Sequence, residues 1–185
     1  IRDEYIARNM YLYIFEISAP RGFGEQWAQG HLKELVPELI KPTKKIESNY
    51  SGEYDFLYKL RDEKVIKIEV KASRAVDFDS REALYVKALS WSGKEPFDMN
   101  FQQVKPKCCD VFVWVGVWRD VIKYWVLASK EVSKNKYYSK GQHRGNKGEG
   151  QLHLKHDNIK DFIQYEVQPK VLLEKIIEAY ARQIS

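Results

Sequence analysis

Hydrophobic residues recur every three to four positions near both ends of the chain, which is the period of an amphipathic helix. The first such stripe predicts a helix over residues 6–17, which Pro20 ends. The second predicts a helix over residues 24–40, kinked or shortened by Pro37. A third stripe predicts a C-terminal helix that begins near Leu172.

The middle of the chain changes to a period of two, which is typical of strands. Residues 54–60 and 65–72 alternate and are joined by a short polar turn, so they predict a β-hairpin. Residues 111–117 are apolar at nearly every position, as in a strand buried on both faces. The other segments predict strands (121–128 and 151–155), a loop followed by a helix (77–91), a short helix (96–105) and a glycine-rich loop (135–150).

These elements predict one α/β domain in which helices flank a central β-sheet of four to six strands. A length of 185 residues fits a single domain. The composition, 44% hydrophobic and 31% charged, excludes a disordered or collagen-like chain. The formal net charge of +5 is compatible with binding to nucleic acid.

Several features lead us to expect a cytoplasmic protein. The longest uncharged apolar run, Val111 to Trp118, is much shorter than the roughly 20 residues of a membrane helix. The charged residues near the start leave no cleavable signal pattern. Cys108 and Cys109 are adjacent, so they do not form a useful disulfide staple, and a reducing compartment is expected.

Candidate chemistry lies on the predicted hairpin. Glu69 and Lys71 share one face of its second strand, and Asp55 on the first strand can come level with them. The two carboxylates could hold Mg²⁺, a hard cation that keeps most of its waters. Such an ion lowers the pKa of water and neutralises charge on a phosphate. Lys71 could orient or activate the water and offset charge in the transition state.

The same residues also fit an ordinary strand surface with cross-strand ion pairs. A second match to the short motif, Asp62-Glu63-Lys64, falls in the predicted turn and lacks a supporting strand. The order of elements favours the catalytic interpretation of the first match. A helix that carries an acid precedes the hairpin, and a helix and a buried strand follow it.

This arrangement resembles the PD-(D/E)xK nuclease superfamily, in particular the type II restriction endonucleases. The resemblance covers about residues 24–128, and it departs from the family at Tyr54, where proline is frequent. The matching segments are Gly24-Glu25, Tyr54-Asp55-Phe56, Ile68-Glu69-Val70-Lys71-Ala72-Ser73 and Phe101-Gln102-Gln103-Val104-Lys105. The resemblance implies a restriction-endonuclease-like core with a mixed sheet, and Mg²⁺-dependent hydrolysis of DNA phosphodiester bonds by Asp55, Glu69 and Lys71.

The resemblance also makes Glu25 a candidate third metal ligand, with Glu34 and Glu38 as alternatives. An acid in the first turn of a helix is also favoured by the helix dipole alone. The candidate DNA contacts are Ser73, Arg74, Gln102, Gln103, Lys105, Lys140, His143, Arg144 and Lys147. The last four lie in the basic, glycine-rich loop, which suits phosphate contacts or is simply solvated.

The chain is little more than the expected core plus one basic loop, and it is similar in this respect to the small catalytic subunit of a heterodimeric type IIS restriction enzyme. The apolar stripes of both terminal helices should be used in packing, which leaves little surface for reading bases. We therefore expect double-stranded DNA as the substrate and a second protein subunit that carries sequence recognition. The alternatives are a structure-specific repair or junction-resolving nuclease of the same fold, and a non-catalytic DNA-binding subunit.

Overall fold

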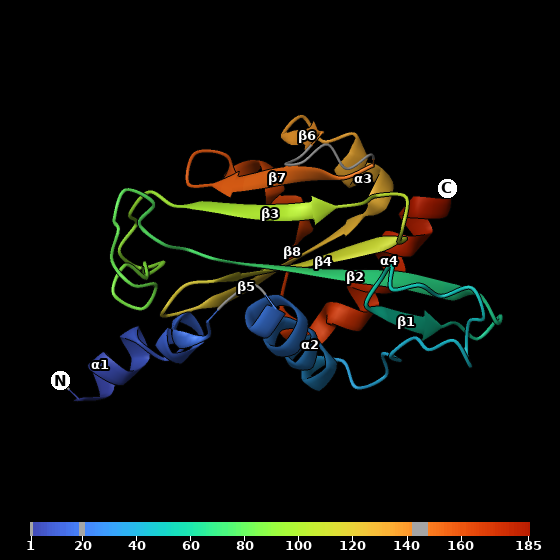
Figure 1. Ribbon diagram of the computed structural model, residues 1–185, viewed down its shortest axis with the longest axis horizontal. Coiled ribbons are helices and arrows are strands. Elements are labelled where there is room, and N and C mark those ends of the chain that lie inside the picture. The colour runs from blue at the N-terminus through green and yellow to red at the C-terminus, as the bar shows by residue number, and fades with distance from the viewer. Residues whose placement is uncertain (1, 19–20, 142–147) are drawn as a thin grey trace.

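The protein is built around a five-stranded mixed sheet with the strand order β1-β2-β4-β5-β8 (Figure 1). The computed structural model describes residues 2–18, 21–141 and 148–185. Strands β2 and β4 are parallel, and the other neighbouring pairs are antiparallel. The bounds are β1 (Phe56–Lys59), β2 (Val65–Arg74), β4 (Val111–Val117), β5 (Ile122–Ala128) and β8 (Glu166–Val167). The predicted α/β architecture with a central mixed sheet is confirmed.

A second, antiparallel sheet has the order β3-β7-β6 and stacks over one face of the first (Figure 1). Its strands are β3 (Asp98–Val104), β6 (Tyr138–Lys140) and β7 (Gly150–Lys155). We predicted a helix over residues 96–105, and this prediction was wrong, because the segment forms β3. A β-bulge explains the error: the pairing shifts between Phe101 and Val104, so these inward residues have a helix-like spacing of three.

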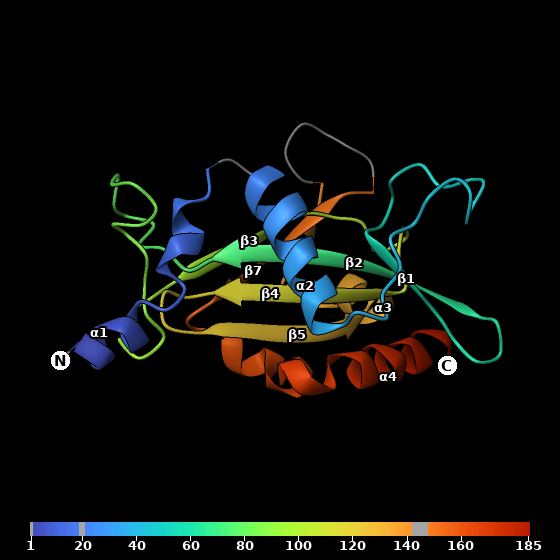
Figure 2. The same cartoon turned by 90° about the horizontal axis from the view of Figure 1, so that it is seen from below.

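Helices α2 and α4 cover the opposite face of the five-stranded sheet (Figure 2), whereas α3 and η4 contribute Val132 and Phe162 to the core on the side of the second sheet. Helix α2 ends just before Pro37, as predicted, because the residue preceding a proline disfavours the helical conformation. The helical segments are α1 (Arg2–Arg8), η1 (Leu12–Glu16), the π-helical η2 (Arg21–Ala28), α2 (Gln29–Leu35), α3 (Ser129–Ser133), η4 (Ile159–Tyr165), η5 (Pro169–Val171) and α4 (Leu172–Ile184).

One hydrophobic core lies on each side of the central sheet. Ile68 and Val113 pack beneath the helices, whereas Trp114 and Trp125 pack beneath the second sheet. Strand β4 is buried at every position, as expected. A Cβ atom at Gly116 would lie 2.8 Å from Trp125 Cζ3 of the neighbouring strand and 3.1 Å from Met99 Cε of the second sheet, so this glycine allows the two sheets to approach closely.

Two other helix predictions need correction. The structure describes all of residues 77–91 and shows turns there rather than a helix. The first predicted helix breaks into α1 and η1, and only η1 is anchored, through the buried side chains of Ile14 and Phe15. We expected the apolar stripe of this helix to be used in packing, but helix α1 contributes no buried residue. Its Tyr5 and Ile6 are exposed, and so is Met10 in the turn that follows.

Within the described ranges, none of the helices combines the length and the apolar character that crossing a membrane requires.

Candidate active site

Asp55 lies where strand β1 begins to pair with β2. Its backbone N–H donates to the Ile68 carbonyl at 3.0 Å, and Phe56 faces Ile68 in the ladder. Its carboxylate oxygen Oδ2 accepts a hydrogen bond from the backbone N–H of Val70 at 2.8 Å. Because the ladder with β1 ends here, the Asp55 side chain satisfies a donor of β2 that β1 no longer reaches.

Glu69 and Lys71 extend from the same face of β2, as the alternation predicted. Lys71 Nζ lies 2.9 Å from Glu69 Oε1. The two side chains are only 17% and 18% exposed, so this ion pair is partly shielded from water. The structure therefore brings Asp55, Glu69 and Lys71 together, whereas the discarded match Asp62-Glu63-Lys64 lies in the exposed turn.

The two carboxyl groups disturb each other's ionisation. Burial, together with the charge of Asp55, raises the pKa of Glu69 to about 7, although Lys71 opposes this shift. Burial also raises the pKa of Asp55 above its ordinary value, against the opposing effects of the Val70 N–H and Lys71. A close pair of partly buried carboxylates is therefore unfavourable when both are ionised.

This donor set fits a hard divalent cation. A cation between Asp55 and Glu69 would stabilise the ionised forms of both carboxyl groups, which burial disfavours. Among the described residues, no group of three or more acidic, histidine or cysteine side chains could hold a metal ion. Two carboxylates suit Mg²⁺, which is commonly bound through one or two carboxylates and completes its coordination with water and phosphate oxygens.

Gln29, at the start of α2, orients Asp55 and was missed in the sequence. Its Nε2 donates to Asp55 Oδ1 at 2.8 Å, and its Oε1 accepts a hydrogen bond from Lys41. These two bonds fix which end of the amide faces the acid. The sequence predicted acidic partners on this helix, and the neutral amide of Gln29 was not among them. The available signal was its position four residues after Glu25 on the same predicted helix.

Glu25 is not brought into a cluster with the two acids. It lies on η2, and its side chain is exposed. Glu34 and Glu38, the alternatives, are also exposed. Gln29, rather than any of these glutamates, makes the helix contact with Asp55.

Tyr50 is a second residue near the acids that the sequence did not single out. Its hydroxyl donates to the Tyr54 carbonyl at 2.9 Å. Burial and then the negative charge of Asp55 raise the pKa of Tyr50. This residue forms part of the wall beside the carboxylates and keeps its proton at neutral pH.

Arg74 has a structural role rather than an open position for DNA. Its Nη1 donates to the carbonyls of Ile14 at 3.1 Å and Ile17 at 2.8 Å, and its guanidinium stacks on the ring of Phe23. These contacts tie the N-terminal segment to the end of β2. Ser73 is partly buried on the same strand.

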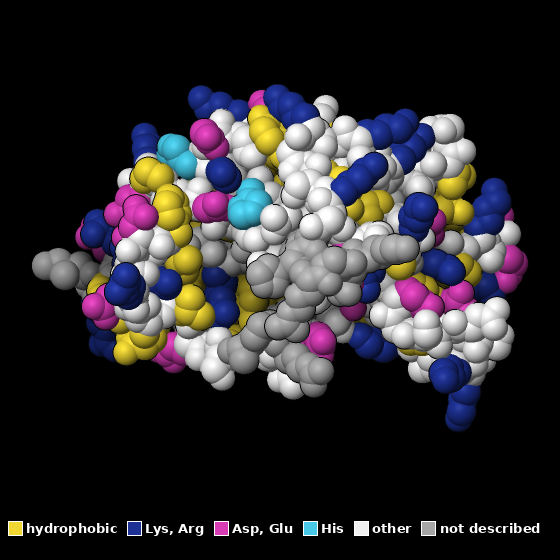
Figure 3. All heavy atoms as spheres, turned by 45° about the horizontal axis from the view of Figure 1, so that its top comes forward, with side chains coloured by type: hydrophobic (Ala, Val, Ile, Leu, Met, Phe, Trp, Pro, Cys, Tyr) yellow, Lys and Arg dark blue, Asp and Glu magenta, His cyan; other side chains and the backbone are white. Residues whose placement is uncertain are grey.

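Lys105 lies close enough to the acids for the charge of Glu69 to contribute to its raised pKa, although a hydrogen bond to Glu149 is the main cause. Lys105 Nζ lies 3.0 Å from Glu149 Oε1. Gln102 and Gln103 are exposed at the bulge of β3, where Gln103 has a φ of 53°. These residues lie toward the second sheet, and Figure 3 shows basic, acidic and histidine side chains among uncharged atoms on this side of the molecule.

Lys140 is exposed at the end of β6. His143, Arg144 and Lys147 lie outside the described residues.

The two cysteines differ in their surroundings. Cys109 is buried, its Sγ lies 3.3 Å from Ser129 Oγ, and burial strongly raises the pKa of its thiol. Cys108 is partly exposed, and its backbone N–H donates to the Lys105 carbonyl at 3.0 Å. Both thiols are free, as expected for a chain without a disulfide framework.

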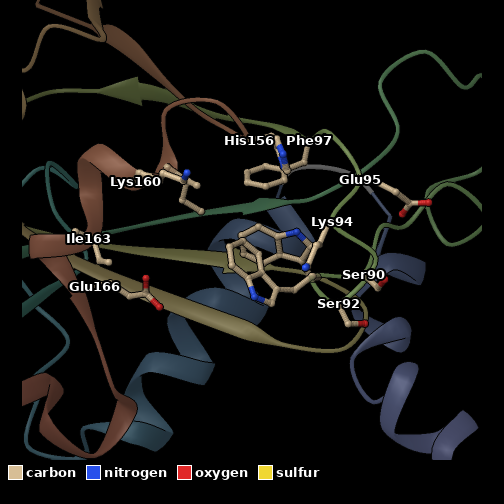
Figure 4. Close-up of a pocket in the computed structure, with 12 residues that line it drawn as sticks. Ser90, Ser92, Lys94, Glu95, Phe97, His156, Lys160, Ile163 and Glu166 are labelled. Atoms are coloured by element: carbon tan, nitrogen blue, oxygen red, sulfur yellow. The ribbon is translucent and has the colours of Figure 1, made fainter.

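A cavity of about 480 Å³ lies away from the acids (Figure 4). Its floor is aromatic: Trp91 and Phe97 each pack edge-on against Trp118, with ring centroids 5.1 and 5.0 Å apart. Figure 4 shows Lys160 on one side of these rings and Ser92 on the other. Its lining contains none of the three catalytic candidates, so we do not place the chemistry there.

No protein-family model matches the chain, and no curated protein matches its sequence.

Proposed function

We propose that this protein is a Mg²⁺-dependent DNA endonuclease of the PD-(D/E)xK type. The observation that supports this function is the convergence of Asp55, Glu69 and Lys71 where β1 meets β2. A surface ion pair would account for Glu69 and Lys71 but not for Asp55. Burial, and then the charge of Asp55, raises the pKa of Glu69 in spite of Lys71, and such a perturbed carboxyl pair is typical of a functional site.

In this proposal, Asp55 and Glu69 hold the metal ion. Mg²⁺ bound there would supply positive charge to the phosphate and promote the ionisation of water. Gln29 and the Val70 N–H hold the Asp55 carboxylate in a fixed orientation. Glu69 must lose its proton before it can bind a cation. Lys71, held by Glu69, would orient the attacking water and offset the negative charge that develops on the phosphoryl group.

We further propose that the chain is the cleavage component of a cytoplasmic type II restriction system, acts on double-stranded DNA and works with a second protein subunit. The net charge of +5 favours association with DNA. One pair of carboxylates provides one cleavage site, so cutting both strands requires a second active site.

The metal ligands are tested with supercoiled plasmid and Mg²⁺. Asp55→Asn and Glu69→Gln preserve the side-chain shape but remove a charge, and we expect each to lower the cleavage rate at least about 10²-fold. Glu63→Gln, in the exposed turn, is the matched control and should cut at the wild-type rate. Full cleavage by Asp55→Asn or Glu69→Gln would exclude this site.

Two further measurements distinguish the role of Lys71 from that of the metal ligands. Lys71→Ala should lose about 10²-fold in rate, because a charge stabiliser is removed. It should still bind Mg²⁺ in calorimetry, because an ammonium group is not a metal ligand. A variant that no longer binds the ion would contradict the role assigned to Lys71.

A further inference from the structure

The second sheet has one apolar face and one polar face. Met99 and Phe101 point inward and are buried. The alternate residues of its strands make up what we call the amide face: Asp98, Asn100, Gln102, Ser139, Gln151, His153 and Lys155. Asn100 is paired with His153 in the ladder, and Asp98 with Lys155.

The composition of the amide face is unfavourable for a strand. Asn and Asp are depleted in strands, whose exposed positions usually carry β-branched residues. Asn100 nevertheless lies in the middle of β3, and Gln151 lies beside it on β7. Residues that oppose the local structural preference are expected where they serve a function.

Hydrogen bonds within the amide face hold its side chains in place. Asn100 Nδ2 donates to Gln151 Oε1 at 3.2 Å, and Asn100 Oδ1 is buried without a hydrogen-bond partner in the described part of the chain. His153 Nδ1 lies 2.6 Å from Asp98 Oδ1 and donates to it, so Nε2 retains its own hydrogen-bonding capacity. Asn100 therefore holds Gln151 in place, whereas Gln151 Nε2 and His153 Nε2 remain for a ligand.

A hollow of about 310 Å³ adjoins this surface. Its walls include Tyr137, His153 and Lys155. Asn158 holds its shape, because Oδ1 accepts from the Lys155 N–H at 2.7 Å and Nδ2 donates to the His153 carbonyl at 2.9 Å. The amide face is thus a shaped polar surface with a basic residue at its margin.

The amide face also leads to the catalytic acids. Strand β3 runs toward Lys105, whose pKa responds to the charge of Glu69. At roughly 3.3 Å per residue, Asn100 lies about 17 Å along the chain from Lys105. That length corresponds to about five base pairs of duplex at roughly 3.4 Å each.

We propose that the amide face lies in the major groove of duplex DNA, where Gln151, held by Asn100, and His153 contact base edges near the cleaved phosphate. The groove is about 12 Å wide and admits a pair of strands, and a Gln side chain matches the donor and acceptor of adenine. Lys155 then meets a backbone phosphate. This inference rests on the proposed function, because it takes DNA as the substrate.

The test selects ligands from a random-sequence duplex library with the non-cleaving Glu69→Gln protein. We expect an adenine-containing sequence to be bound at least about tenfold more tightly than random duplex. In the same background, the double variant Asn100→Ala and Gln151→Ala should bind the selected sequence at least about tenfold more weakly. Its affinity for random duplex should change less than about twofold. Gln168→Ala, an exposed amide outside this sheet, should retain the full preference.

A second variant checks whether misfolding explains a lost preference. His153→Gln keeps a polar side chain and should change which base is preferred without changing the urea midpoint. Absence of any sequence preference, or an unchanged preference in the double variant, would overturn the inference. Plasmid cleavage by the wild-type protein is measured separately: Mg²⁺-dependent cutting without preference leaves the proposed function intact, and selective binding without cutting refutes only that function.

Discussion

Glu69 is the residue whose ionisation should control both metal binding and stability. Its pKa of about 7 exceeds its ordinary value of 4.5, because the folded protein holds the proton more tightly than the unfolded chain. The resulting stabilisation is fully present below about pH 4.5 and is lost as pH rises through about 7. Mg²⁺ should reverse the loss by replacing the proton with a cation.

Urea unfolding of the metal-free protein tests this expectation. Between pH 4.5 and 8.5, the wild type should lose about 3 kcal/mol more stability than Glu69→Gln, which has no proton to release. Glu63→Gln, in the exposed turn, should follow the wild type at every pH. Parallel pH profiles for the wild type and Glu69→Gln would show that Glu69 ionises normally.

Gln29 provides a prediction about positioning. Gln29→Ala removes the donor to Asp55 Oδ1, so the carboxylate is less well oriented, and Mg²⁺ affinity should fall about 10- to 100-fold. Gln26→Ala changes an exposed glutamine of the same helical segment and is the matched control. Calorimetry with Mg²⁺ compares the two, and equal affinities would exclude the positioning role of Gln29.

At the scale of elements, the sequence predicted the hairpin and strand β4 because one alternation pattern, or one unbroken apolar run, dominates each. It failed for β3, because the bulge places Phe101 and Val104 three residues apart and imitates a helix. The second sheet could not be foreseen without that strand. The premise that little surface remains for reading bases did not take this sheet into account, and the second subunit stays a prediction.

The candidate site, too, was predicted only in part. Asp55, Glu69 and Lys71 were predicted because strand alternation fixes which side chains share a face. The role of Gln29 could not be predicted, since its contact with Asp55 depends on how α2 crosses the sheet. Arg74 was placed with the DNA contacts on charge alone, and only the packing of η1 shows its structural use.

The close approach of the two sheets gives a prediction for stability. Gly116→Ala places a methyl group 2.8 Å from Trp125 Cζ3 and 3.1 Å from Met99 Cε, so it should destabilise the protein by about 1–3 kcal/mol. Gly30→Ala, in α2 with no atom within 4 Å, should instead stabilise it by about 0.5–1 kcal/mol. Urea denaturation measures both, and equal effects would contradict the packing argument.

At the scale of the whole molecule, the candidate catalytic acids Asp55 and Glu69 lie at the edge where the helix-covered sheet and the second sheet come together. The exposed lysines around them should make DNA affinity strongly dependent on salt. We expect the logarithm of the association constant for random duplex to fall linearly with the logarithm of salt concentration.

The purified chain alone should nick plasmid rather than cut both strands at one unique site, because it offers one pair of catalytic acids. Gel analysis of plasmid at near-physiological salt distinguishes nicked from linear product. Efficient linearisation at a single sequence, with no other protein present, would instead indicate a self-sufficient homodimer.

The contrast between the two adjacent cysteines has a practical consequence. The buried thiol of Cys109 stays protonated and shielded, whereas its neighbour Cys108 is accessible. A maleimide fluorophore should therefore attach at one position without any engineered substitution. Because Cys108 is close to Lys105, whose pKa responds to the charge of Glu69, such a dye would sit near the candidate catalytic acids and should report the arrival of DNA in real time.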